Sequence, residues 1–177
     1  MKKLTKIVSI LCISLLLTQC GKDKFTIAKG KVGQLTSKTT VQELDKIFAK
    51  DSLVKILSEG AKGNNYFQDD DEYLIYDKNG KHMLTIVPKE QLDSTSTIKS
   101  IQIFDDRFKT TSGLNIRTTF SEIRANNTID KIESSFYSAT LFIDELNATI
   151  AIDKEELGLK GFSNQKVTIE QIPDLAK

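Results

Sequence analysis

Two segments of ten residues, LTSKTTVQEL (residues 35–44) and LNIRTTFSEI (residues 114–123), follow one pattern at a spacing of 79 residues. Each contains a leucine, a basic residue, two threonines, an apolar residue, a glutamate and a final leucine or isoleucine. The second threonine and the glutamate three positions later can form a capping box, which satisfies two backbone N–H groups at a helix start. The pairs Thr40 with Glu43 and Thr119 with Glu122 therefore predict two equivalent helix starts, and the match predicts an internal duplication.

The residues after each start indicate how far each helix extends. Val41, Leu44, Ile47 and Phe48 recur at helical spacing after the first start. Phe120 and Ile123 begin the second helix, which is expected to be shorter and to end at Asn126 and Asn127.

Strand patterns follow each helix. YLIYDKNGKHMLTIV (residues 73–87) predicts a hairpin, because Asn79-Gly80 favours the positive backbone angles of a tight turn. STIKSIQIFDD (residues 96–106) is predicted as a third strand. In the second half, SATLFIDELNATIAID (residues 138–153) resembles a hairpin, and VTIEQIPDL (residues 167–175) repeats part of the third strand of the first half.

These elements predict an α+β fold built from two tandem units, each a helix followed by a small antiparallel meander. We expect the units to share a sheet, with both helices packed on one face. The expected domain covers residues 25–177 and divides into halves of about 25–108 and 109–177.

The N-terminus has the features of an export signal. Lys2, Lys3 and Lys6 precede an apolar run at residues 7–17, which is only about half of the ~20 residues needed to cross a bilayer. The following Leu17-Thr18-Gln19-Cys20 resembles the lipobox of bacterial lipoproteins, in which a peptidase cuts before a lipid-modified cysteine, although Gln19 replaces the usual small residue. We expect residues 1–19 to be a signal peptide, Cys20 the lipid attachment site and residues 20–24 a tether. The alternative is an uncleaved apolar helix with Cys20 as an ordinary thiol.

The cysteine count agrees with lipid attachment. Cys12 leaves with the signal, so Cys20 is the single cysteine of the mature chain, which excludes an internal disulfide. Two or three acyl chains on one cysteine anchor a protein stably. The chain has 25 basic and 24 acidic side chains, and loss of the three signal lysines leaves 22 basic ones. This balance gives no sign of nucleic-acid binding.

The residues contain no recognised catalytic or metal-binding pattern, and no cofactor is expected. His82 is the single histidine, so multi-histidine metal sites and Ser-His-Asp arrangements lack partners. The acidic run at residues 68–72 could hold calcium but is better explained as a solvated loop, and Asp77-Lys78-Asn79-Gly80 is better explained as a turn. Asp105 and Asp106 are adjacent on an expected strand and should point to opposite faces, where solvation at the strand end is the favoured interpretation.

Two blocks of the sequence, VGQLTSKTTVQEL (residues 32–44) and residues 96–123, resemble a bacterial lipoprotein family of unknown function, whose enterobacterial member belongs to the sigma-E envelope-stress regulon. The shared motifs are caps, turns and strands, so the resemblance implies a cell-envelope lipoprotein and no enzymatic activity. The expected architecture also resembles the beta-lactamase-inhibitor protein and small outer-membrane assembly lipoproteins, which bind other proteins through such sheets.

Two classes of function follow. The favoured hypothesis is a non-enzymatic protein of the bacterial cell envelope, anchored through Cys20 to a membrane, most simply the outer membrane, and binding another envelope protein. The alternative is a small hydrolase or ligand-binding lipoprotein that uses carboxylates.

Overall fold

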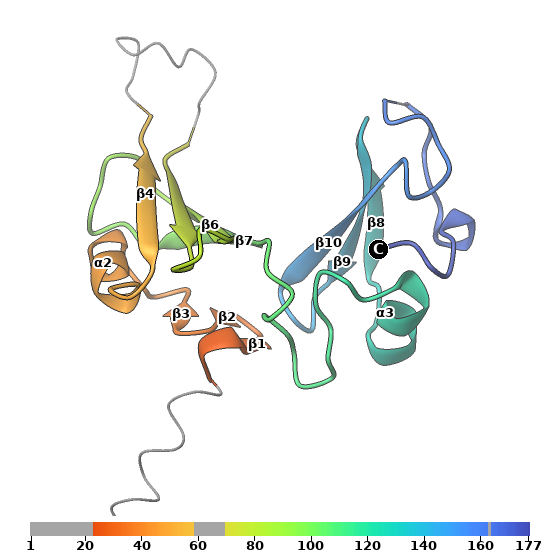
Figure 1. The fold of residues 1–177 in the computed structure, drawn as a ribbon. Coiled ribbons are helices and arrows are strands. Elements are labelled where there is room, and N and C mark those ends of the chain that lie inside the picture. Colours follow the sequence, from red (N-terminus) through yellow and green to blue (C-terminus); the bar gives the residue numbers. More distant parts are fainter. Residues whose placement is uncertain (1–22, 59–69, 163) are drawn as a thin grey trace, which may run out of the picture.

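The computed structural model describes residues 23–58, 70–162 and 164–177. These residues form a mixed α and β structure made mostly of strands, with three antiparallel sheets and two short α-helices. Two hydrophobic clusters divide the chain into a first lobe, with core residues from Phe25 to Phe108, and a second lobe, with core residues from Leu114 to Ala176. The segment between β7 and α3 connects the two lobes (Figure 1).

The first lobe contains two sheets. Its larger sheet has the strand order β4-β5-β6-β7, and its smaller sheet has the order β1-β2-β3. The elements are η2 (Asp23–Phe25), β1 (Ile27–Ala28), β2 (Lys31–Val32), β3 (Leu35–Thr36), η3 (Val41–Glu43), α2 (Leu44–Ile47), β4 (Ser52–Ile56), β5 (Glu72–Tyr76), β6 (His82–Pro88) and β7 (Ile98–Ile103).

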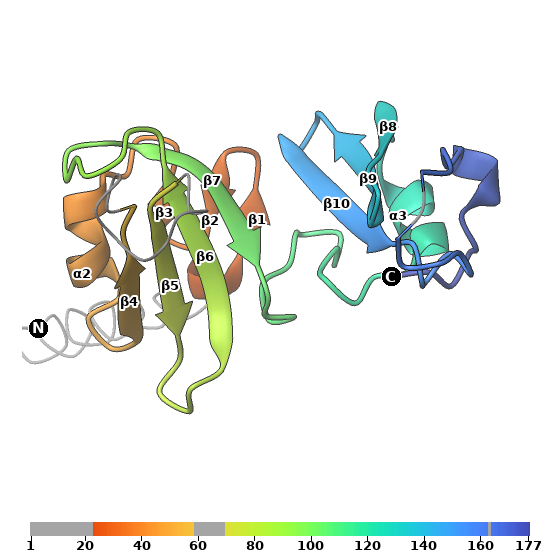
Figure 2. The same cartoon turned by 90° about the horizontal axis from the view of Figure 1, so that it is seen from above.

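The second lobe contains one helix and one three-stranded sheet with the order β10-β9-β8. Figure 2 shows β10 at one edge of this sheet. The elements are α3 (Phe120–Asn126), β8 (Lys131–Ser134), β9 (Ser138–Ile143), β10 (Ala148–Asp153) and the 3-10 turn η5 (Ile169–Gln171).

The predicted helix starts are confirmed. Both carry capping boxes. The backbone N–H and the hydroxyl of Thr40 donate to Glu43 Oε2 at 2.7 and 2.9 Å, and those of Thr119 donate to Glu122 Oε2 at 2.9 and 2.8 Å. Thr40 also forms an isolated bridge with Thr97, outside any strand. The second helix is not the shorter one, because η3 and α2 together cover residues 41–47 and α3 covers seven residues.

The hydrogen bonds just before each helix repeat at the same spacing of 79 residues. The N–H of Thr36 donates to the hydroxyl of Thr39 at 3.0 Å, and the N–H of Asn115 donates to the hydroxyl of Thr118 at 2.9 Å. The N–H groups of Thr39 and Thr118 return to the carbonyls of Thr36 and Asn115. The two segments are therefore equivalent in backbone structure as well as in sequence.

The two lobes are also alike in the hydrogen bonds that each helix start makes with a later segment of the chain. The N–H groups of Val41 and Gln42 donate to the carbonyls of Ser96 and Ser94, at 3.0 and 2.9 Å. In the second lobe, the N–H groups that follow Thr119 donate to the segment that ends the chain, with Phe120 bonded to Ala176 at 2.8 Å and Ser121 to Asp174 at 3.0 Å. The first N–H groups of a helix have no acceptor within the helix. In each lobe, carbonyl groups of a later segment accept these hydrogen bonds.

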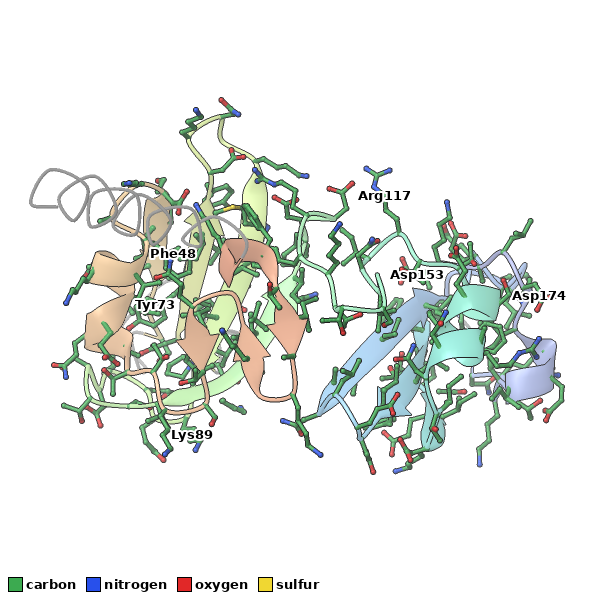
Figure 3. The ribbon with its side chains drawn as sticks, turned by 90° about the horizontal axis from the view of Figure 1, so that it is seen from below. Phe48, Tyr73, Lys89, Arg117, Asp153 and Asp174 are labelled. Atoms are coloured by element: carbon green, nitrogen blue, oxygen red, sulfur yellow. The ribbon has the colours of Figure 1, made fainter. Side chains whose placement is uncertain are left out.

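Each lobe has its own core. Tyr73 and Ile75 of β5 pair with Ile86 and Leu84 of β6, so all four share one face of the larger sheet of the first lobe. Phe48, at the end of α2, belongs to the same cluster and lies with Tyr73 between α2 and the sheet (Figure 3).

The core of the second lobe is built in the same way. Phe120 and Ile123 of α3 join Leu141 and Ile143 of β9 and Ile152 of β10. The expectation of one shared sheet is wrong, because among the described residues no strand of one lobe pairs with a strand of the other. Each lobe instead buries its own apolar strand face, so nothing requires a common sheet.

The strands agree with the sequence in part. The hairpins β5–β6 and β9–β10 and the strand β7 are confirmed. In the first hairpin only Gly80 has positive φ, at +79°, and Asn79 does not. VTIEQIPDL forms no strand: Thr168 and Gln171 make a third capping box around η5. In sequence and position it matches the Glu90-Gln91-Leu92 segment after β6 better, because Glu90-Gln91-Leu92 and Glu170-Gln171-Ile172 each precede the residues that bond to a helix start.

Two strands and one boundary differ from the expectation. The strands β4 and β8, which directly follow the helices, were not predicted. The first described element, η2, begins at Asp23, inside the expected tether, and joins the first lobe through Lys24 and Phe25. Lys24 forms an ion pair with Asp51 at 3.0 Å, and the Phe25 ring packs edge-on against Phe108 at 5.0 Å.

Candidate protein-binding site

Three aromatic rings gather on the surface of the second lobe. Phe136 and Phe162 stack with their ring centres 4.9 Å apart and their planes 7° from parallel, and Tyr137 meets Phe162 edge-on at 5.5 Å. Their exposed fractions are 52% for Phe136, 64% for Tyr137 and 63% for Phe162. We name Phe136, Tyr137 and Phe162 the aromatic cluster. Contiguous exposed apolar surface of this kind is typical of sites that bind other molecules.

The turn between β8 and β9 fixes two of the rings. Ser135 organises this turn, because its hydroxyl accepts hydrogen bonds from the N–H groups of Tyr137 and Ser138, at 3.1 and 3.0 Å. The N–H of Ser135 donates to the carbonyl of Ser138 at 2.9 Å and closes the turn. The chain therefore presents Phe136 and Tyr137 on a hydrogen-bonded turn.

The segment after β10 supplies the third ring. Lys154 has no exposed surface, and its Nζ donates to the carbonyl of Gln165 at 2.9 Å. The N–H of Val167 donates to the Ser134 hydroxyl at 2.8 Å and ties the same segment to the end of β8. Both contacts fix the segment just after Phe162, whose ring stacks on Phe136 of the β8–β9 turn.

Phe136 and Phe162 of the aromatic cluster border a hollow of about 560 Å³ that is open to solvent. Lys160 contributes one positive charge to the lining, and Asn164 and Gln165 contribute amide groups. The lining residues are Phe136, Gly158, Leu159, Lys160, Phe162, Asn164 and Gln165, none of which is a carboxylate. Apolar rings beside a few polar groups suit the binding of a peptide or loop better than acid–base chemistry.

The first lobe has a second group of rings on the other face of its larger sheet. His82 lies between Tyr76 and Phe104, with ring centres at 4.9 and 4.2 Å and planes within 28° of parallel. Its Nε2 lies 3.1 Å from both the Leu84 carbonyl and the Thr85 hydroxyl. These contacts engage the ring of His82 within its own lobe, as expected for a structural histidine.

The two aspartates that follow β7 differ from the expectation. They lie beyond the strand in a turn, so the alternation of strand side chains does not separate them. Asp105 and Asp106 both accept hydrogen bonds from Lys81 Nζ, at 3.0 and 3.2 Å. Asp105 has no exposed surface and is not solvated.

Arg107 completes this charged cluster at the end of β7. It donates through Nε to Asp105 at 2.8 Å and through a terminal nitrogen to Asp77 at 2.9 Å. Burial alone would raise the pKa of Asp105, but hydrogen bonds from Arg107 and Lys81 outweigh it and hold the pKa well below its ordinary value. A carboxylate that two cations hold ionised is a poor general acid or base, so the contacts of Asp105 favour a structural role for this residue.

The acidic run and the turn have structural roles as well. Asp71 is buried and accepts hydrogen bonds from the N–H and hydroxyl of Ser58, both at 2.8 Å, and from the N–H of Leu92 at 2.6 Å. It therefore anchors three segments and is not part of a solvated loop. Asp70 pairs with Lys99 at 3.0 Å. Asp77 accepts from the N–H groups of Asn79 and Lys81, so the expected turn is confirmed.

The predicted lipid site and the start of the acidic run fall in two segments of the chain. Residues 1–22 and 59–69, which include Cys12, Cys20, Gln68 and Asp69, lie outside the described residues. In the described part of the chain, no group of three or more His, Cys, Asp or Glu side chains is placed to hold a metal ion. No helix there is long and apolar enough to span a membrane.

The aromatic cluster was missed by the sequence analysis. Its one local signal is Ser-Ser-Phe-Tyr-Ser at residues 134–138, where two aromatic residues stand in a polar turn. Phe162 carries no comparable signal, because its neighbourhood depends on the fold.

No protein-family model, no curated protein and no solved structure matches this chain. The assignment of function therefore depends on the residues and on the geometry of the two lobes.

Proposed function

We propose that the chain is a lipid-anchored protein of the bacterial cell envelope, most simply of the outer membrane, that binds another envelope protein and has no catalytic centre. The observation that carries the binding proposal is the aromatic cluster, in which each ring is more than half exposed and two of the three, Phe136 and Phe162, border an open hollow. Phenylalanine and tyrosine are enriched at the centres of protein interfaces because they bury large apolar areas at low entropic cost.

The anchoring part of the proposal depends on the sequence alone. The apolar run, the lipobox-like Leu17-Thr18-Gln19-Cys20 and the lone mature cysteine support diacylglyceryl attachment at Cys20. The first described element, η2, begins at Asp23, so only residues 21 and 22 separate the proposed lipid from the first lobe. A short connection of this kind would keep the first lobe close to the bilayer surface.

Partner capture tests the binding proposal. The full chain would be expressed in a bacterial envelope, crosslinked, extracted and analysed for co-purifying proteins. Phe136→Ala combined with Phe162→Ala should remove the specific partner while the melting temperature stays nearly unchanged, because these rings are exposed. Ile116→Ala, which trims an exposed apolar residue outside the cluster, is the matched control. Equal capture by all three proteins would contradict a role for the cluster.

Intact mass spectrometry tests the anchor. The membrane fraction should contain a chain that starts at Cys20 and carries acyl mass, and Cys20→Ser should abolish this species. A soluble, unmodified wild-type chain that retains Met1 would contradict the anchoring proposal.

A further inference from the structure

The outer edge of β10 is open. This strand ends the sheet order β10-β9-β8, and among the described residues only β9 pairs with it. The N–H of Lys154 donates to the carbonyl of Tyr137 on the β9 side. Since backbone groups alternate sides along an antiparallel strand, Thr149 and Ala151 direct their N–H and C=O groups away from β9, and so does the N–H of Asp153. The carbonyl of Asp153 accepts from the N–H of Glu156 at 3.0 Å. Figure 3 labels Asp153 at the end of this edge.

The first lobe shows what occupies the equivalent edge. There the chain runs through α2, β4, β5 and β6, covers the helix start with Ser94 and Ser96, and then enters β7, which pairs with β6. In the second lobe it runs through α3 and β8 to β10 and covers the helix start with Asp174 and Ala176. The described second lobe contains no counterpart of β7, so its sheet has one strand fewer on this edge.

The composition of β10 distinguishes it from the edge strands β4, β7 and β8. Natural edge strands commonly carry lysine or proline, which discourages pairing with other chains. The edge strands β4, β7 and β8 carry Lys55, Lys99 and Lys131. β10 has the sequence ATIAID, in which residues 148–152 contain neither a charged residue nor proline and the one charge is Asp153 at the end of the strand. This edge lacks the usual protection against strand addition.

The side chains of β7 indicate the chemistry of the occupant. Ile101 and Ile103 pair with Ile86 and Leu84 and pack against the core of the first lobe. The second lobe offers Ile150, which is only partly buried, at its open edge. A second copy of β10 would keep its own isoleucines in its own core, whereas an extended segment with unpacked apolar side chains could cover this one.

We propose that β10 binds an extended segment of a partner polypeptide, which adds as an antiparallel strand with apolar residues at alternate positions, in the role that β7 has in the first lobe. This inference deepens the proposed function and rests on it, because it names the class of partner segment. Tyr137, opposite Lys154 just beyond β10, places the aromatic cluster next to the same end of the strand. Backbone hydrogen bonds would supply affinity and alternate side chains would supply specificity.

The probe that tests the proposal is a fluorescent peptide with the sequence of residues 97–106, TIKSIQIFDD, titrated against the full chain in phospholipid nanodiscs, with empty nanodiscs as the blank. In the first lobe the N–H of Phe104 donates to the carbonyl of Met83 on β6, so by alternation the N–H groups of Ser100 and Gln102 also face β6. N-methylation at these two positions should weaken binding about tenfold or more, which corresponds to about 1.4 kcal/mol per factor of ten. N-methylation at Lys99 and Ile101, whose N–H groups face away, is the matched control.

A protein variant tests the same edge from the other side. Ala151→Pro removes one outward N–H group without removing a bond to β9, and proline is tolerated at such edge positions. It should weaken binding of the unmodified peptide about tenfold, equivalent to about 1.4 kcal/mol. Ala151→Ser should bind as the wild type does. The methylated peptides keep the proposal testable if the proline variant fails to fold.

The outcomes separate the possible occupants. Absence of peptide binding, or equal binding of both methylated peptides, would overturn the proposal. A concentration-dependent dimer that Ala151→Pro abolishes, without peptide binding, would assign the edge to a second copy and overturn the partner assignment. If Ala151→Pro leaves partner capture intact while loss of Phe136 and Phe162 abolishes it, the strand proposal fails and the proposed function stands.

Discussion

The buried carboxylate of Asp105 organises the charged cluster that follows β7. Asp105 has no exposed surface, yet Lys81 and Arg107 reach it from half-exposed positions and hold it ionised. Asp106 extends the group to Arg117, which projects from the segment between the lobes (Figure 3). The cluster therefore ties the turn between β5 and β6 and the exit of β7 into one unit.

Loss of the Asp105 charge should destabilise the first lobe. Asp105→Asn leaves two cations with weaker acceptors and should lower the free energy of unfolding at pH 7 by about 1 to 3 kcal/mol. The folded pKa of Asp105 lies below its unfolded value of about 3.9. Its stabilisation is therefore present above that pH and is lost as pH falls toward the folded pKa.

Urea unfolding at pH 7 and pH 3 checks both statements. The wild type should lose more stability between these two conditions than Asp105→Asn does. Asp71 and Asp77 also have lowered pKa values, so the variant should retain some pH dependence. An identical pH dependence in both proteins would show that the Asp105 charge contributes nothing.

At the scale of elements, the two helix starts are stabilised by the same set of interactions. Each combines a threonine–glutamate capping box with two backbone hydrogen bonds that the helix start donates to carbonyls of a later segment. Short helices have little stability of their own, because nucleation is costly. Helices of this length therefore depend on their caps and on packing against the sheet of their own lobe.

Removal of either capping threonine should have a similar effect. Thr40→Ala and Thr119→Ala should each lower the free energy of unfolding by about 1 kcal/mol, the usual cost of a lost cap. Thr111→Ala, at an exposed turn position, should change it by less than about 0.5 kcal/mol. Thermal unfolding followed by circular dichroism measures all three. Cap variants no less stable than Thr111→Ala would refute the role of the capping boxes.

At the scale of the whole molecule, the two lobes have separate cores and separate sheets. Helix, meander and covering segment recur in the same order in both, which is the arrangement expected from duplication of one unit. Since the lobes share neither a sheet nor a core cluster, a packing defect in one lobe should not directly destabilise the core of the other.

Equivalent core substitutions should therefore act locally. Leu44 and Ile123 hold matching positions in the repeat, and each is 1% exposed. Leu44→Ala and Ile123→Ala should each cost about 2 to 5 kcal/mol in the lobe that carries it. Hydrogen exchange followed by mass spectrometry should show lost protection in β5 and β6 for the first variant and in β9 for the second. Equal loss in both lobes would mean that they unfold as one cooperative unit.

Sequence alone was sufficient where the physics is local. The capping boxes, the hairpins β5–β6 and β9–β10 and the strand β7 follow from residues within a few positions of one another, so their patterns could be read directly. β8 was missed because KIES is short and has one apolar residue, and the fate of VTIEQIPDL was missed because Thr168 and Gln171 cap it as a turn.

The sequence by itself determined the mixed α and β class and the two equivalent helix starts, since caps and periodicity are local properties of the chain, and the export signal with its candidate lipid site stays a prediction from the same kind of local pattern. Only the tertiary structure decided that the lobes keep separate sheets, that Asp105 is buried between two cations, that Phe162 joins Phe136 and Tyr137, and that β10 has an open edge. Each of these depends on contacts between residues distant in sequence, and such contacts are set by which apolar faces bury one another.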